Sequence, residues 1–124
     1  MDEADQRPPV WVGHITLTTD CLEDSREFMA SLGMRRIASG DGFAVLELRA
    51  GTHLVLLERD EIEPGVAPFD LMVENLDTTH QRLSELGLAP SAISEGQIHR
   101  SFTVRDPSGH TISFNSSHVS DQPV

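Results

Sequence analysis

Polar and apolar residues alternate along two short stretches of the chain, residues 12–19 and 69–74. A period of two is typical of a β-strand with one buried face. After each stretch, the apolar residues change to the spacing of a helix with one buried side. The pattern therefore predicts helices at about 22–32 and 76–86. Their apolar positions are Leu22, Phe28, Met29 and Leu32 in the first, and Leu76, Leu83 and Leu86 in the second.

Local signals mark the ends of both helices. Asp20 is followed three residues later by Glu23, which is the spacing of a capping box at a helix start. Asn75 or Asp77 is the candidate N-cap of the second helix. We expect each helix to end at a glycine, because a left-handed residue costs least there. These glycines are Gly33 and Gly87.

Three further strand candidates follow each helix, separated by turns rich in glycine and proline. The order strand–helix–strand–strand–strand thus occurs twice. It predicts an α+β fold with two paired βαβββ modules and with helices on the outside of curved sheets. The candidates are residues 34–39, 43–49 and 53–58 in the first half, and 88–94, 99–105 and 110–115 in the second.

The two halves also repeat at the level of single residues. At a constant offset of 54, Leu22 matches Leu76, and the glycines at the two helix ends match each other. Two repeated units can pair around a pseudo-twofold axis, and their inward faces then enclose one cleft. We therefore look for function in the side chains of that cleft.

Two segments carry a resemblance to a known family: GHITLTTDCLEDSREFMASLGM at residues 13–34 and VRDPSGHTISF at 104–114. They resemble the vicinal oxygen chelate superfamily, which includes glyoxalase I, bleomycin-resistance proteins and extradiol dioxygenases. The resemblance implies paired βαβββ modules and, in many members, a dimer. On this basis we expect a single domain over residues 1–124. Module one would span about 10–60, a linker 61–66 and module two about 67–118.

Composition narrows the function classes. The chain of 124 residues has nine Lys+Arg against twenty Asp+Glu, a formal charge of −11. It has no basic cluster to neutralise phosphates, which argues against nucleic acid and anionic membrane surfaces as partners. There is no basic-then-apolar leader and no long apolar span, so we expect a cytoplasmic protein. The single cysteine, Cys21, cannot form an internal disulfide.

The resemblance also implies where a metal would lie. Metal-binding relatives place four ligands in the cleft, from the first and last strands of each half, and the ion acts as a Lewis acid. In this chain the corresponding positions are His14, Val55, Pro68 and Ser113. Valine and proline cannot ligate, and serine is a poor neutral ligand. We therefore expect no metal and no other cofactor, and we interpret His14 as a cleft histidine that hydrogen-bonds a ligand or the backbone.

Two alternatives could restore a metal site. A displaced site could form from His14, His53 and Asp70, because His53 and Asp70 each lie two residues from a lost ligand. Same-face neighbours on a strand are about 6–7 Å apart, so the ion would have to move by several ångströms. A one-residue shift of register would instead bring in Glu58.

Two function classes remain. The first is a small-molecule-binding protein without metal, of the resistance or sequestration type, that holds an organic ligand and assembles as a homodimer. The second is a glyoxalase- or dioxygenase-type enzyme that uses a displaced metal at His14 or acid–base chemistry from His14 with Asp70. The sequence assigns no catalytic residue and leaves open whether the modules pair within one chain or between two chains. The ligand-binding candidates are Trp11, His14, Thr16, His53, Val55, Asp70, Met72, Ser113 and Asn115.

Overall fold

The computed structural model describes residues 6–117 and 123–124, so the expected end of module two at residue 118 lies outside the described residues. Module one forms a four-stranded sheet, here called sheet A, in the order β1-β4-β3-β2. Strand β1 runs parallel to β4, and the other pairs are antiparallel. The elements are β1 (His14–Thr19), α1 (Leu22–Leu32), β2 (Arg35–Gly40), β3 (Phe43–Glu47), the short 3₁₀ helix η1 (Arg49–Gly51) and β4 (His53–Glu58).

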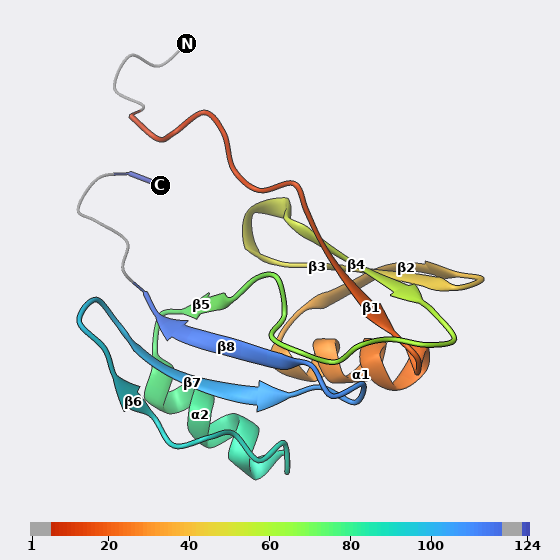
Figure 1. Ribbon diagram of the computed structural model, residues 1–124. Coiled ribbons are helices and arrows are strands. Elements are labelled where there is room, and N and C mark those ends of the chain that lie inside the picture. The colour runs from red at the N-terminus through yellow and green to blue at the C-terminus, as the bar shows by residue number, and fades with distance from the viewer. Residues whose placement is uncertain (1–5, 118–122) are drawn as a thin grey trace.

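Module two repeats this topology in sheet B, with the order β5-β8-β7-β6. The two sheets are separate, as Figure 1 shows. The predicted pair of βαβββ modules is therefore confirmed. Within the described residues, neither helix is long and apolar enough to cross a membrane. The elements are β5 (Leu71–Val73), α2 (Leu76–Glu85), β6 (Ser94–Glu95), β7 (Arg100–Arg105) and β8 (Thr111–Ser116).

Each sheet buries one face against the helix of its own module. Helix α1 packs on β2, β3 and β4, and α2 packs on β7 and β8. Alternate strand residues supply the core, including the fully buried Leu46, Leu54 and Leu56 in sheet A. In sheet B the rings of Phe102 and Phe114 stack at 5.0 Å between centroids. The residues between these core positions point to the opposite side, which we call the open face of each sheet.

The two helix starts differ in how they are capped. Asn75 caps α2, because its side chain accepts a hydrogen bond from Thr78 N at 3.0 Å. Of the two N-cap candidates predicted for this helix, Asn75 and Asp77, the first is therefore confirmed. The capping box predicted for Asp20 and Glu23 is wrong, because α1 has Cys21 at its N-cap position and no side-chain cap. The Asp20 carboxylate instead accepts a hydrogen bond from Ser108 Oγ, in the turn before β8.

The strand predicted at 88–94 is also largely wrong, since only Ser94 and Glu95 form β6. Ala89 has a positive φ of 51°, a left-handed conformation that interrupts an extended strand. The next residue, Pro90, has no backbone N–H to donate. Pairing with β7 survives in part, because Ser91 N donates to Thr103 O at 2.8 Å.

A buried chain of hydroxyl groups joins the two modules. Thr19 Oγ1, at the end of β1, lies 2.6 Å from Ser25 Oγ in α1 and 2.7 Å from Ser108 Oγ in module two. Because Ser108 Oγ donates to Asp20, it accepts the proton of Thr19, and Thr19 in turn accepts that of Ser25. The chain thus runs in one direction and satisfies three buried hydroxyls at the junction.

A second contact between the modules involves the helices. Arg82 on α2 donates from Nη1 to Ser31 O at 2.8 Å and from Nη2 to Leu32 O at 3.0 Å. These are carbonyl groups at the C-terminal end of α1, which has no basic residue in its own last turn. A cation at this end interacts favourably with the helix dipole. Module two therefore supplies the positive charge that the end of α1 lacks.

The turn that carries Ser108 is organised by Asp106, which is only 4% exposed. Its Oδ1 accepts from Ser108 N at 3.1 Å and from His110 N at 2.7 Å, while its Oδ2 is buried without a partner in the described residues. Burial raises the pKa of the Asp106 carboxyl, against the opposing effect of these backbone hydrogen bonds. The buried His110 ring bonds back to Thr18 O at 2.8 Å, so this turn also ties module two to β1.

We predict that Asp106→Asn becomes progressively more favourable for stability as the pH rises. The amide keeps the Oδ1 acceptor but removes a carboxylate whose charged form burial disfavours. A carboxyl with a raised folded-state pKa loses stability as pH rises from its unfolded pKa through its folded pKa. The free energy of unfolding of the variant minus that of the wild type should therefore increase from about pH 3.5 to pH 7. Chemical denaturation across this range measures it, with Asp41→Asn in the exposed β2–β3 turn as control. A difference independent of pH would contradict the prediction.

Candidate functional site

Except for Trp11, the predicted ligand-binding residues lie on or next to the open faces of two different sheets. His14 and Thr16 on β1 are exposed, and their parallel neighbours on β4 are His53 and Val55. The module-two candidates are on or next to sheet B. Within the described residues, no strand pairing joins the two sheets. The structure thus gathers the candidates into two sets. One comprises His14, Thr16, His53 and Val55, and the other Asp70, Met72, Ser113 and Asn115.

A polar row crosses one end of the open face of sheet A. Strand register places His14 beside His53, His53 beside Glu47, and Glu47 beside Arg35. The His14 and His53 rings meet edge to face at 5.9 Å between centroids. His53 Nε2 lies 3.2 Å from Glu47 Oε2, and Arg35 pairs with the other carboxylate oxygen of Glu47. The acidic partner of this histidine pair is therefore Glu47.

Electrostatics at this row favour a charged Glu47. The hydrogen bond from Arg35 is the main cause that lowers the pKa of the Glu47 carboxyl, and the hydrogen bond with His53 is the second. Because Nε2 of His53 faces this carboxylate, its Nδ1 remains for another partner. Glu47 was missed as a candidate in the sequence. Pairing the expected strands 43–49 and 53–58 across the turn at Gly51 would have placed it opposite His53.

An apolar patch lies on β3 and β4 beyond this row. Val45 lies beside Val55, and Phe43 lies beside Leu57. Phe43 is 38% exposed, and its ring covers Gly40, where a Cβ atom would come within 2.3 Å of the ring. The open face of sheet A therefore combines an apolar surface with hydrogen-bonding groups at one end, which is the usual composition of a small-molecule site.

The open face of sheet B is more polar. Asn115 is nearly buried, and its Nδ2 donates to Asp70 Oδ2 at 2.9 Å. Met72 lies beside Asn115 on β5 and is 46% exposed, whereas Ser113 is half-buried on β8. Asp70 is thus engaged within its own module through its hydrogen bond with Asn115.

Trp11 lies outside both sets. It is 69% exposed in the extended segment before β1, next to Val10 and Val12, which are also exposed. Thr52 Oγ1 donates to Val12 O at 2.6 Å, which fixes the end of this segment beside the start of β4. The segment therefore presents three adjacent apolar side chains on the surface.

The residues at the family's metal positions do not form a ligand set. Of His14, Val55, Pro68 and Ser113, only His14 carries a good ligand atom. No group of three His, Cys, Asp or Glu side chains in the described ranges is arranged to hold a metal ion. Among the described residues, His14, His53 and Glu47 do not form such a group either, and the Glu47 carboxylate is paired with Arg35. These residues do not fit the metal that the family implies.

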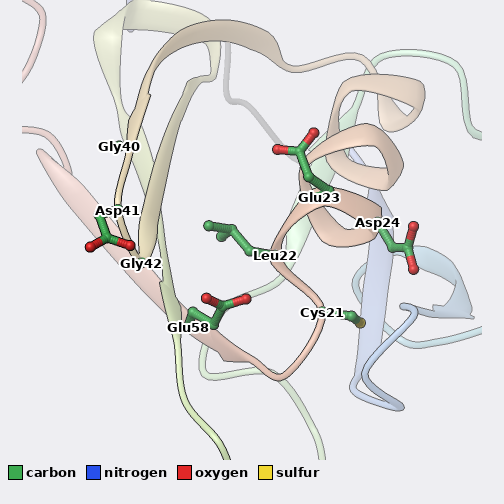
Figure 2. Close-up of a pocket in the computed structure, with 8 residues that line it drawn as sticks. All are labelled: Cys21, Leu22, Glu23, Asp24, Gly40, Asp41, Gly42 and Glu58. Atoms are coloured by element: carbon green, nitrogen blue, oxygen red, sulfur yellow. The ribbon is translucent and has the colours of Figure 1, made fainter.

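A different pocket, of about 450 Å³, lies between the start of α1 and the β2–β3 turn. Figure 2 shows Leu22 and Glu58 pointing into this space, whereas Asp24 and Asp41 point away from it. Glu23 and Cys21 also line it, and none of the ligand-binding candidates does. Its acidic rim has no arrangement for a metal ion among the described residues, so we assign it no function.

Comparison with known proteins identifies the family. Residues 11–114 match the sequence model of the Glyoxalase/Bleomycin resistance protein/Dioxygenase superfamily, and the chain belongs to this superfamily. No curated protein sequence matches the chain significantly.

Solved structures agree on the fold. Lactoylglutathione lyase from Agrobacterium tumefaciens is 15% identical, with a TM-score of 0.76 over 90% of this chain and 97% of that one. The oxidase ChaP-H2 is 23% identical, with a TM-score of 0.72 over 89% and 95%. A glyoxylase/bleomycin resistance protein/dioxygenase domain from a Frankia species is 22% identical, with a TM-score of 0.71 over 89% and 93%. At these identities the likeness concerns the fold, and chemistry has to be argued from the site.

We predict that Arg35→Gln raises the pKa of the Glu47 carboxyl toward its ordinary value, because it removes the main stabilising hydrogen bond. His53→Ala should raise it less, since His53 is the second cause. NMR titration of the Glu47 side chain measures both shifts. The matched control is Arg36→Gln, which removes the same charge from the next residue of β2 and should leave Glu47 unchanged. An equal effect of both arginine variants would show that general charge, not this contact, sets the pKa.

Proposed function

We propose that the protein binds a small organic compound with a largely apolar body and does not convert it, as a sequestration-type member of its superfamily would. The observation that carries this proposal is the open face of sheet A, where an accessible apolar patch adjoins the row of His14, His53 and Glu47. The patch suits an aromatic or aliphatic body, and Nδ1 of His53 suits a polar group on it. Three of the four residues at the family's metal positions are poor ligands or cannot bind a metal, which favours ligand binding over metal-assisted catalysis.

We further propose that the cleft is completed in a homodimer, with sheet A of one chain facing sheet B of the partner. Among the described residues of one chain, no strand pairing joins the two halves of the predicted cleft, and both halves expose apolar residues, among them Phe43 and Met72. Two copies related by a twofold axis would form two equivalent clefts. Trp11, exposed at the edge of sheet A, would then border the ligand or the partner chain.

A second function is favoured by one specific observation. The carboxylate of Glu47 holds the ring of His53 by its Nε2 atom, as a general base is held by its orienting residue. His14 is adjacent, so this row could move a proton to or from a bound compound without a metal. The acid–base pair in this alternative is His53 with Glu47. It replaces the pair of His14 with Asp70, because Asp70 belongs to the other sheet and bonds Asn115.

We predict that a thermal-shift screen of small aromatic compounds will find ligands for the wild-type protein. A ligand at 100 times its dissociation constant adds about 2.7 kcal/mol to stability. Val55→Trp should fill the site and abolish the shift, because Val55 lies in the apolar patch. The control is Val73→Trp, which alters a half-buried residue of β5 that is not a ligand-binding candidate and should leave the shift in place. Chromatography of the compound after incubation detects turnover. If the compound is consumed at a rate that falls with His53→Ala, the enzyme alternative replaces the binding proposal.

We predict that two variants which each fail to bind will recover binding when mixed. Val55→Trp blocks the open face of sheet A, and Ser113→Trp blocks that of sheet B. If each cleft uses one face from each chain, a mixed dimer contains one cleft with two intact faces. Co-refolding equal amounts should restore about a quarter of the wild-type sites by random pairing of chains. If the cleft forms within one chain, every chain is blocked and no binding returns. Sedimentation of the wild type checks the dimer itself.

A further inference from the structure

The two modules carry opposite charges at equivalent positions of their open faces. In sheet A, Glu47 on β3 pairs with His53 on β4. In sheet B, the same place in the topology is taken by Arg105 on β7, which pairs with Thr111 on β8. The position that carries a carboxylate in module one therefore carries a guanidinium in module two.

Arg105 lines a pocket of about 320 Å³. Thr103 and Thr111, which lie next to it on the open face, also line the pocket, so three side-chain donors border the same space. One wall is the segment that replaces the missing start of β6, where the left-handed Ala89 turns the chain. Ser91 then anchors this wall, because its Oγ accepts from Thr103 N at 2.8 Å.

Among the residues that the structure describes, the three donors have no side-chain partner. Within residues 6–117, no hydrogen bond or ion pair involves the Arg105 guanidinium or the hydroxyl groups of Thr103 and Thr111. Four other arginines of this acidic chain are paired with carboxylates, whereas Arg59 and Arg82 donate to backbone carbonyls. The four pairs are Arg26 with Glu23, Arg35 with Glu47, Arg49 with Glu74, and Arg100 with Asp77 and Glu95. Arg105 is thus an exposed charged donor at the pocket, beside two hydroxyl groups that have no partner among the described residues.

We propose that this pocket binds the oxyanion end of a small ligand, a carboxylate or a phosphate. A guanidinium presents parallel N–H groups that match two oxygens of such an anion, and hydroxyls donate to the remaining oxygen sites. The inference deepens the proposed function. It assigns the ligand an anionic oxygen group on the side of sheet B, opposite the apolar patch and histidines of sheet A.

The test uses NMR titration of the isotope-labelled full chain at 0.15 M salt, where the Debye length of about 8 Å screens the net negative charge. Three probes are compared: inorganic phosphate, benzoate, and the neutral isostere benzamide. Phosphate and benzoate should produce saturable shifts at the amides of Thr103, Arg105 and Thr111. Benzamide should bind at least tenfold more weakly than benzoate, which corresponds to losing one charge-assisted hydrogen-bond pair.

Arg105→Gln should weaken phosphate and benzoate binding at least tenfold, and Thr111→Val should weaken it several-fold while keeping the charge. Arg36→Gln, which removes an exposed arginine from sheet A, is the matched control and should leave both affinities unchanged. Dispersed spectra confirm that each variant is folded. Equal losses in the two arginine variants, or shifts spread over the surface, overturn the proposal.

The probes also separate this inference from the proposed function. Phosphate has no apolar body and tests the pocket alone. If benzoate and benzamide bind equally and Arg105→Gln changes neither, the oxyanion site is wrong while the binding cleft stands. If phosphate binds through Arg105 but aromatic compounds bind nowhere, the oxyanion site stands and the binding proposal fails.

Discussion

One-sided burial is the constraint on which the structure depends. Each four-stranded sheet has a single helix to cover it, so only one of its two faces enters the core. Because strand side chains alternate, every second residue is committed to packing and the residue between is released from it. In β4, Leu54 and Leu56 are fully buried, while His53, Val55 and Leu57 are left to the open face. The side chains that are free to serve function are therefore the ones that packing does not use.

The sequence was sufficient for the architecture because this alternation is strong and local. The helices begin at Leu22 and Leu76 as their apolar spacing predicts, and the five-element order appears in both halves. Errors arose where a distant contact decides local structure. Asp20 does not cap α1, because its carboxylate accepts from Ser108 of the other module. The strand expected at 88–94 is cut short by the backbone of Ala89, whose left-handed conformation no local signal indicated.

The candidate site was only partly predictable for a related reason. The face of a sheet to which a residue points follows from the alternation of residues along its strand. His14, Val55 and Ser113 accordingly lie on open faces in the observed strand pairing. Lateral neighbours depend on how strands pair, which a single strand does not reveal. Glu47 gained significance only once β3 was placed beside β4. The duplicated modules have also diverged in charge at matched positions, so similarity between the halves was a guide to shape and not to chemistry.

The contact from Arg82 to the end of α1 has a consequence for how the chain matures. Proteins are synthesised from the N-terminus, and early modules commonly fold before later ones emerge. Here the last carbonyls of α1 meet their cation only after some fifty further residues have been made, as the positions of Leu32 and Arg82 show. The chain of buried hydroxyls that includes Thr19 and Ser25 likewise reaches Ser108 only after Ser108 has been synthesised. When module one leaves the ribosome, the end of α1 therefore lacks its contact with Arg82, and Thr19 lacks its contact with Ser108. The maturation of module one is tied to the completion of module two.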